Sequence, residues 1–126
     1  MKKILIISLL LASSLLANMQ WADSYKEALQ SAKVQNKIVM VMLSRSTCGV
    51  CEYMKAQVFT EKNIIKQFNE RFVGVNIDLD FEEAPQSLDY IGTPTFYFLD
   101  KDAKKLGRIS GGKNAKSFSQ ALEKIN

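Results

Sequence analysis

The only two cysteines of the 126-residue chain, Cys48 and Cys51, are separated by Gly49 and Val50 in the pattern C-x-x-C, and the chain contains no histidine. Two thiols at this spacing can form a disulfide, bind a soft metal ion or exchange electrons with a second disulfide. A disulfide across two intervening residues closes a very short loop, so its stabilising effect falls near the bottom of the ~0–5 kcal/mol range. A purely structural bridge is therefore a weak explanation for the pair.

Metal binding explains the two cysteines no better. A zinc site needs four ligands, usually cysteine and histidine, and this chain offers two cysteines alone. Haem attachment requires C-x-x-C-H, whereas Glu52 follows the second cysteine. Two thiolates with a thioether from Met54, Met40 or Met42 could hold Cu(I), although core positions explain these methionines better. We therefore expect no metal and no cofactor other than a redox-active disulfide between the cysteines, with a Cu(I) site as the alternative.

Reversible redox chemistry remains, and the elements around the cysteines supply its physical basis. An unbroken apolar run, Ile38–Leu43, has the length and composition of a strand buried on both faces, and it leads towards Cys48. After it, Cys51, Met54 and Val58 share one face of a helix. Cys48 is therefore expected at the helix N-terminus, where unpaired backbone N–H groups and the helix dipole favour the thiolate that attacks a disulfide. Cys51, one turn into the helix, is expected to be the buried resolving thiol.

The rest of the chain has the pattern of alternating helices and strands. Ser24 and Glu27 form a capping box before a helical periodicity, and Thr60 can cap a further helix. Trp21 and the aromatic residues 96–98 are expected in the core. The expected elements are helix 24–34, strand 38–43, a helix from the cysteines, a helix after residue 60, strand 72–77, polar loop 78–83, short helix 86–90, strand 95–99, strand 106–110 and a last helix after the Asn114 cap. This order predicts an α/β fold with a central mixed sheet flanked by helices.

The N-terminus has the pattern of an export signal. Two lysines precede an apolar stretch at residues 4–16, and Ala17 is a small residue at which a signal peptidase could cut. We expect residues 1–17 to be a signal peptide and residues 18–126 to form one domain, exported to the bacterial periplasm. An uncleaved membrane anchor is the alternative, because Leu15 departs from the A-x-A cleavage pattern. Without the two N-terminal lysines, 15 basic residues face 13 acidic ones, a balance that gives no reason to expect nucleic-acid binding.

Three motifs along the chain together resemble the thioredoxin-fold family. C-G-V-C at 48–51, after an apolar strand, is similar to the family's active site. I-G-T-P-T at 91–95 resembles the loop that carries its cis-proline, and N-I-D at 76–78 resembles the end of its third strand. The resemblance covers essentially all of residues 18–126. The segment 24–37 is closer to exported thioredoxin-like reductases, such as the C-terminal thioredoxin domain of transmembrane thiol:disulfide interchange proteins.

The resemblance implies which residues meet a substrate. They are the catalytic cysteines, Cys48 and Cys51, and the substrate-binding residues Gly49, Val50, Thr93, Pro94 and Gly111. Pro94 would be cis and lie against the cysteines, and Thr93 would offer its backbone to an extended substrate segment. The alternative for Pro94 is a trans proline that opens an edge strand. The alternative for Gly111 is a flexible break before the last helix.

Several positions depart from the thioredoxin pattern. Met42 stands where many thioredoxins have a buried Asp, Thr47 where they have Trp, and Gly74 where they have Lys on the third strand. Proton transfer at Cys51 would then use water or, more weakly, Glu52. These differences argue against a general, fast thioredoxin of the cytoplasmic type and favour a specialised exported enzyme.

The direction of electron flow depends on the residues around Cys48. The Gly49-Val50 dipeptide contains neither a His, which would favour an oxidant, nor the Pro of reducing thioredoxins, and Arg45 is the one nearby cation, unless it serves only solubility. We expect a monomeric thiol:disulfide oxidoreductase that reduces or isomerises disulfides in exported proteins. A membrane electron donor of the thiol:disulfide interchange type would keep it reduced. The alternatives are a disulfide-donating oxidase and a non-enzymatic module, either a Cu(I) carrier or a thioredoxin-fold binding domain.

Overall fold

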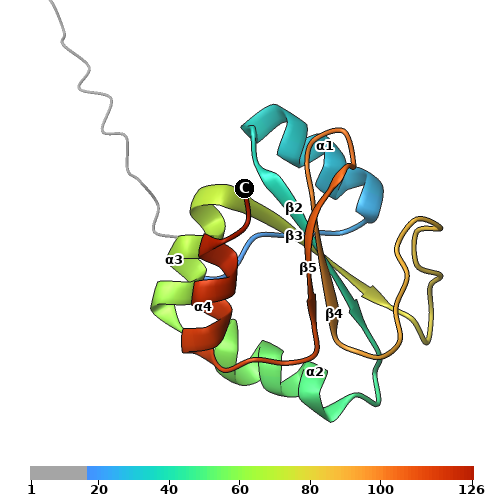
Figure 1. Ribbon diagram of the computed structural model, residues 1–126, viewed down its shortest axis with the longest axis vertical. Coiled ribbons are helices and arrows are strands. Elements are labelled where there is room, and N and C mark those ends of the chain that lie inside the picture. Colours follow the sequence, from blue (N-terminus) through green and yellow to red (C-terminus); the bar gives the residue numbers. More distant parts are fainter. Residues whose placement is uncertain (1–16) are drawn as a thin grey trace, which may run out of the picture.

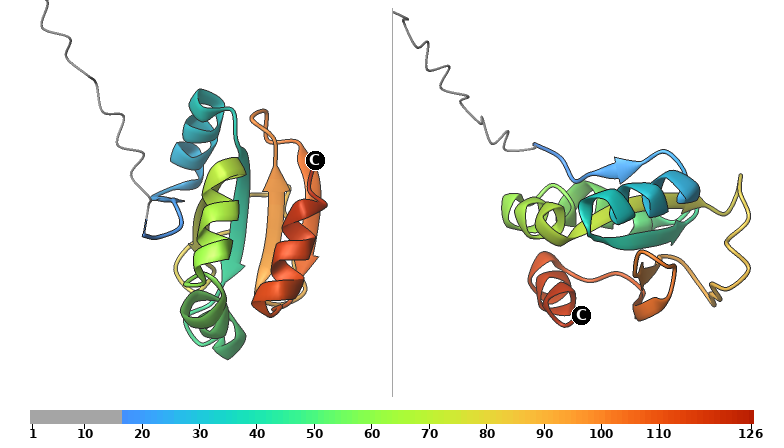
Figure 2. Two further views of the ribbon diagram at one scale, coloured as in Figure 1. Left: turned by 90° about the vertical axis from the view of Figure 1, so that its left-hand side faces the viewer. Right: turned by 90° about the horizontal axis from the view of Figure 1, so that it is seen from above.

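The computed structural model describes residues 17–126, which form a five-stranded mixed sheet with helices on both faces (Figure 1, Figure 2). The strands are β1 Trp21–Ala22, β2 Ile38–Ser44, β3 Phe72–Asp78, β4 Thr95–Leu99 and β5 Lys105–Ser110, in the spatial order β1-β3-β2-β4-β5. The helices are α1 Tyr25–Gln35, α2 Gly49–Tyr53, η1 Met54–Val58, α3 Lys62–Arg71 and α4 Ala115–Glu123, where η1 is a π-helical continuation of α2. The α/β class predicted from the sequence is confirmed.

The signal peptide expected at residues 1–17 lies outside the described residues, apart from Ala17. Within residues 17–126, no helix has the length and apolar character needed to cross a membrane. All five strands of this part of the chain join in one sheet.

The central strand is β2, which pairs in parallel with β3 and antiparallel with β4. Its side chains alternate between two hydrophobic clusters. Met40 and Met42 pack with α3 and α4 on one face of the sheet. Val39, Val41 and Leu43 pack with α1 on the other face. A strand covered on both faces therefore precedes the C-x-x-C segment, as its apolar run predicts.

Two of the predicted helix caps are present. The Ser24 hydroxyl accepts a hydrogen bond from the Glu27 N–H at 3.1 Å. The Asn114 side-chain carbonyl accepts one from the Ser117 N–H at 2.9 Å. Helix α1 ends at Asn36, whose φ of 54° is the left-handed conformation that asparagine tolerates at a helix C-terminus. Local sequence signals therefore fix the start of α1 and α4.

Two other local predictions are wrong. The Thr60 hydroxyl donates a hydrogen bond to the Ala56 carbonyl at 2.8 Å, and α3 begins after Glu61, which provides no side-chain cap. The Thr60 hydroxyl bonds to the preceding helix because the last carbonyls of that helix lack helical hydrogen-bond donors. Residues 86–87 form a turn and residues 88–90 are irregular, so the expected short helix is not present. This segment is held by the buried Leu88, a tertiary contact, because so short a stretch gains little from helical hydrogen bonds alone.

The short strand β1, which the sequence does not predict, lies beside β3 and pairs Trp21 with Gly74 in parallel. The Trp21 indole packs against the rings of Phe59 and Phe68. It remains 37% exposed, so it covers the edge of the core instead of being enclosed there. The aromatic residues 96–98 are buried, as predicted.

Candidate redox-active site

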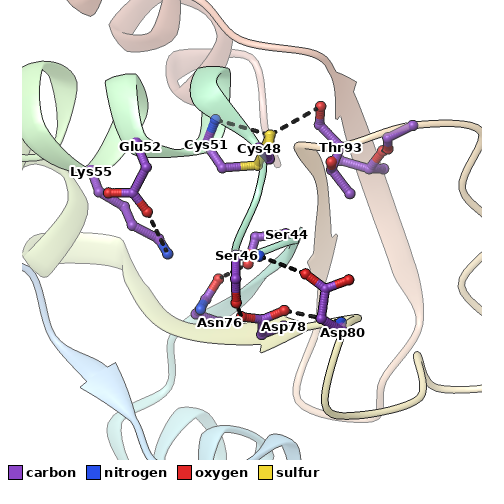
Figure 3. The surroundings of a disulfide bond; sticks show 12 residues. Ser44, Ser46, Cys48, Cys51, Glu52, Lys55, Asn76, Asp78, Asp80 and Thr93 are labelled. Carbon is purple, nitrogen blue, oxygen red and sulfur yellow. Dashed lines mark hydrogen bonds and ion pairs between the residues drawn. A yellow bond between two sulfur atoms is a disulfide. The ribbon is translucent and has the colours of Figure 1, made fainter.

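The two cysteines form a disulfide at the start of α2 (Figure 3). Their Cα atoms are 5.2 Å apart, and Cys48 occupies the N-cap position with an extended backbone, φ −91° and ψ 105°. The Cys48 sulfur accepts a hydrogen bond from the Cys51 N–H at 3.1 Å. Cys48 is half-buried, whereas Cys51 is completely buried. A reaction partner can therefore reach Cys48 but not Cys51.

The loop before β4 lies against the same sulfur. The Thr93 carbonyl oxygen is 3.5 Å from Cys48 Sγ, and the Thr93–Pro94 peptide bond is cis. The sulfur of a disulfide carries no proton, so this contact becomes a hydrogen bond when Cys48 is a thiol. Pro94 is buried, and its carbonyl accepts a hydrogen bond from the Gly111 N–H at 2.8 Å. Three segments that are distant in sequence therefore meet at the disulfide.

The structure brings together the substrate-facing residues expected from the sequence. Gly49 is exposed, with open space where a side chain would project, and Val50 is 48% exposed. Thr93, Pro94 and Gly111 line a hollow of about 190 Å³. Gly111 has a φ of 83°, which glycine adopts without strain. The exposed dipeptide and the hollow form the accessible surface next to Cys48.

Gly112, which the sequence reasoning missed, lies against the same dipeptide. A Cβ at this position would overlap Val50 Cγ1 and come within 3.7 Å of Met54 Sδ. The Lys113 N–H donates a hydrogen bond to Met54 Sδ at 3.4 Å. The thioether that a Cu(I) site would need therefore already accepts a hydrogen bond. In the part of the chain that the structure describes, no three His, Cys, Asp or Glu side chains gather as a metal site. The sequence signal for this contact was the Gly111-Gly112 pair, which by itself indicates only a break before α4.

A polar network holds the turn that precedes Cys48 (Figure 3). The Ser46 hydroxyl donates a hydrogen bond to Asp78 at the end of β3, and the Ser46 N–H donates one to Asp80 at 2.9 Å. Arg45 forms an ion pair with Asp80 at 3.0 Å. The hydrogen bond from Ser46 is the largest of the effects that hold the pKa of Asp78 below its ordinary value of 3.8. These four residues, here named the carboxylate clamp, fix the backbone just before the exposed cysteine. The sequence reasoning named Arg45 as a nearby cation and Asp78 as the end of a strand motif, but it did not predict the network that joins them.

Of the positions that depart from the thioredoxin pattern, Gly74 has a structural explanation. A Cβ on Gly74 would lie 2.7 Å from a ring carbon of Trp21, so the indole occupies the space that a longer side chain would need. Met42 is fully buried in the core. Glu52 is exposed and its carboxylate is 3.9 Å from the Lys55 ammonium group. None of these positions places a buried carboxylate behind the disulfide.

Known proteins resemble this chain in sequence. A family model described as a thioredoxin-like domain matches residues 25–126. Anterior gradient protein 2-B from Xenopus laevis is 30% identical over 83 residues, which cover 66% of this chain and 50% of that protein. The thiol:disulfide interchange protein DsbD from Pseudoalteromonas atlantica is 26% identical over 110 residues, which cover 82% of this chain and 18% of that protein. The chain thus spans about half the length of the first relative and less of the second.

The fold has counterparts among solved structures. A thioredoxin from Thermus thermophilus matches it with a TM-score of 0.70 at 26% identity, over 86% of this chain and 87% of that chain. The resemblance to the thioredoxin fold that the sequence motifs indicate is therefore confirmed. Because the family model matches residues 25–126, most of the sequence, the chain belongs to the family of thioredoxin-like domains.

Proposed function

We propose that this chain is an exported thiol:disulfide oxidoreductase that reduces or isomerises disulfides in exported proteins. The observation that carries the proposal is the difference between the two sulfurs. Cys48 is half-buried beside the Thr93 carbonyl, and Cys51 is enclosed behind it. One sulfur can meet a substrate, while the other can reach only its neighbour. Membership of the thioredoxin-like family supports the same activity, as does the relative that is a thiol:disulfide interchange protein.

The two sulfurs act in sequence. In the reduced protein, the Cys48 thiolate attacks one sulfur of a substrate disulfide, forms a mixed disulfide and releases the other sulfur as a thiolate. The Cys51 thiolate then attacks Cys48 Sγ, and the second substrate sulfur leaves; each released thiolate takes up a proton from solvent. The dithiol loses two electrons and the substrate disulfide gains them. The Cys51 N–H directed at Cys48 Sγ favours the Cys48 thiolate that makes the first attack.

The surroundings of Cys48 support electron delivery rather than disulfide donation. A strong oxidant requires an unusually stable reduced form, and the nearby cation, Arg45, is already paired with Asp80. The carboxylate clamp places negative groups at the turn before Cys48, and the Thr93 carbonyl faces the sulfur. These groups disfavour a negative sulfur. Equilibration in dithiothreitol or glutathione buffers should give a reduction potential near ~−270 mV, whereas a value near ~−120 mV would reverse the direction.

Export is proposed on the N-terminal sequence. The apolar residues 4–16, preceded by two lysines and followed by Ala17, support cleavage and export. In an oxidising compartment the dithiol is consumed at each turnover, so a membrane electron donor of the thiol:disulfide interchange type is proposed as the partner that restores it. Mass spectrometry of the periplasmic protein should find an N-terminus near Asn18. A cytoplasmic protein that retains residues 1–17 would contradict export.

Insulin reduction tests the activity itself. The wild-type protein, supplied with dithiothreitol, should accelerate the reduction of insulin disulfides, and Cys48→Ala should lose this acceleration because the remaining thiol, Cys51, is buried. Cys51→Ala should instead accumulate a mixed disulfide at Cys48, visible on a non-reducing gel. Unchanged acceleration in Cys48→Ala would contradict the mechanism. A wild-type protein without turnover that binds Cu(I) through Met54 would support the carrier instead.

A further inference from the structure

The hollow beside the redox pair contains one charged side chain, Arg108. Its lining consists of residues 90–95, Arg108, Ser110 and Gly111, and none of these residues is acidic. Within residues 17–126, the ion pairs join Arg45 to Asp80 and Lys55 to Glu52, and none involves Arg108. The exposed guanidinium therefore presents its N–H donors to solvent, or to a ligand, in a hollow of about 190 Å³.

The register of β5 explains why Arg108 faces the hollow. β5 is an edge strand, and Arg108 lies opposite Tyr97 of β4. Its neighbour Ile109 is buried in the core cluster that includes α4, so Arg108 and Ser110 extend from the other face of the strand. The other cation near Tyr97, Lys105, lies over the Tyr97 ring at 5.4 Å and does not line the hollow. Among the residues that the structure describes, Arg108 is the only positively charged one that lines the hollow.

We propose that Arg108 is a specificity-determining residue that favours substrates with a carboxylate close to the cysteine that Cys48 attacks. This inference rests on the proposed function, because it names the substrate class of the same dithiol. The occupant of the hollow is an extended segment of a disulfide-containing protein that carries Asp or Glu. A guanidinium binds such a carboxylate through two parallel N–H···O hydrogen bonds, which gives orientation as well as attraction.

The place of the hollow sets the spacing between the substrate cysteine and its carboxylate. Thr93 belongs to both sites, since its carbonyl is 3.5 Å from Cys48 Sγ and the residue lines the hollow. From the Thr93 end of the hollow, Ser110 and then Arg108 follow along β5, about 7 Å apart at ~3.3 Å per residue. An extended peptide advances at the same rate, so the carboxylate is expected about two to four residues from the cysteine bound to Cys48.

The other walls of the hollow favour an apolar neighbour for the acidic side chain. Ile91 is fully exposed and Tyr90 is 40% exposed, and both line the hollow together with Pro94.

Attraction between exposed charges is modest, so an acidic substrate should react about two- to fivefold faster than its neutral counterpart. The same attraction is screened by salt. The preference should therefore decrease as ionic strength rises.

The test uses peptides that differ by one charge. Each peptide has one cysteine in a disulfide with uncharged 2-mercaptoethanol and carries Glu or Gln at one position, about two to four residues to either side of the cysteine. The reduced protein gives two electrons to the peptide disulfide and releases two thiols, while the carboxylate takes no part in the electron transfer. Chromatography of the released peptide thiol gives second-order rates at low and high salt. At one position the Glu peptide should react about two- to fivefold faster at low salt, with a ratio close to one at high salt.

Variants assign this preference to one side chain. Arg108→Gln should lose the preference for Glu, so that its rates with the Glu and Gln peptides become equal. Arg108→Lys should keep part of the preference, because the charge remains while the two-pronged geometry is lost. Lys101→Gln is the matched control. It removes one exposed positive charge from the turn between β4 and β5, at the opposite end of these strands from Thr93, and should keep the full preference.

The outcomes separate this inference from the function on which it rests. A wild type that reduces both peptides at equal rates overturns the role of Arg108 and leaves the oxidoreductase activity intact. The same conclusion follows if Arg108→Gln keeps the preference, or if Lys101→Gln loses it as fully as Arg108→Gln. A protein that reduces no peptide, acidic or neutral, contradicts the proposed function and this inference with it.

Discussion

At the scale of single residues, the two ends of one disulfide differ because their surroundings differ. Cys48 has the Cys51 N–H at 3.1 Å and the Thr93 carbonyl at 3.5 Å, so one group favours a negative sulfur and the other opposes it. Cys51 is enclosed in the core cluster. The carboxylate clamp adds Asp78 and Asp80 at Ser46, in the turn that precedes Cys48. This arrangement suits a sulfur that alternates between thiolate and disulfide, rather than one held permanently as the thiolate.

Asp78 should make the stability of the fold sensitive to acid. The hydrogen bond from Ser46 lowers the pKa of this carboxyl in the folded protein below 3.8, whereas unfolding breaks that bond. A group whose folded pKa is lowered contributes stability that is fully present above its unfolded pKa and is lost as the pH falls through the folded value. The urea midpoint of the wild type should therefore decrease more steeply than that of Asp78→Asn between about pH 4.5 and 2.5.

Two further variants show whether this effect arises from the clamp. Ser46→Ala should reproduce the flatter curve of Asp78→Asn, because it removes the donor that lowers the pKa. Asp102→Asn changes an exposed carboxylate in the turn between β4 and β5, and its curve should follow the wild type. Parallel curves for all four proteins would show that the Ser46–Asp78 bond does not couple to folding.

At the scale of elements, the sequence predicts those parts of the fold whose signals are local. The apolar run 38–43 identifies β2, and the caps at Ser24 and Asn114 place the starts of α1 and α4. Strand β1 has two residues, too few to show a periodicity, and residues 86–90 are shaped by tertiary contacts. The carboxylate clamp could not be predicted either, because it joins residues 32 or more positions apart that meet only when β2 and β3 pair.

The contact between Gly112 and Val50 predicts that two glycines at this site respond oppositely to alanine. Gly112→Ala places a methyl group on Val50, whose β-branched side chain is stiff in a helix, and should destabilise the fold by about 1–2 kcal/mol. Gly49→Ala meets open space in the first turn of α2 and should stabilise it by about 0.4–1 kcal/mol. Urea unfolding of both oxidised proteins measures the difference.

A double variant distinguishes this collision from a general effect on the loop. Val50→Ala combined with Gly112→Ala removes the overlapping methyl group, so the double variant should recover most of the stability that Gly112→Ala loses. The rate of insulin reduction should likewise fall in Gly112→Ala and recover in the double variant, since Val50 lies between the cysteines. Equal stability of Gly112→Ala and Gly49→Ala would contradict the close approach.

At the scale of the whole molecule, we expect the fold not to depend on its disulfide. Two hydrophobic clusters fill the two faces of the sheet, and one of them contains six phenylalanines. The Cys48–Cys51 bridge spans a sequence separation of 3, for which the chain-entropy model gives a stabilisation of about 2 kcal/mol, less than for a bridge that closes a longer loop. The reduced protein should therefore remain folded, as a catalyst that cycles between dithiol and disulfide requires.

The sign of that stability difference reports the direction of electron flow. Folding, unfolding, oxidation and reduction form a closed cycle, so the oxidised form is more stable to unfolding when the folded chain favours the disulfide more than the unfolded chain does. A reductant should show this order, with the oxidised protein more stable by about 2 kcal/mol in urea. The double variant Cys48→Ala/Cys51→Ala, measured with and without dithiothreitol, controls for the reagent and should not change. A reduced form more stable than the oxidised one would make the protein a disulfide donor, and unfolding on reduction would make the bridge a structural one.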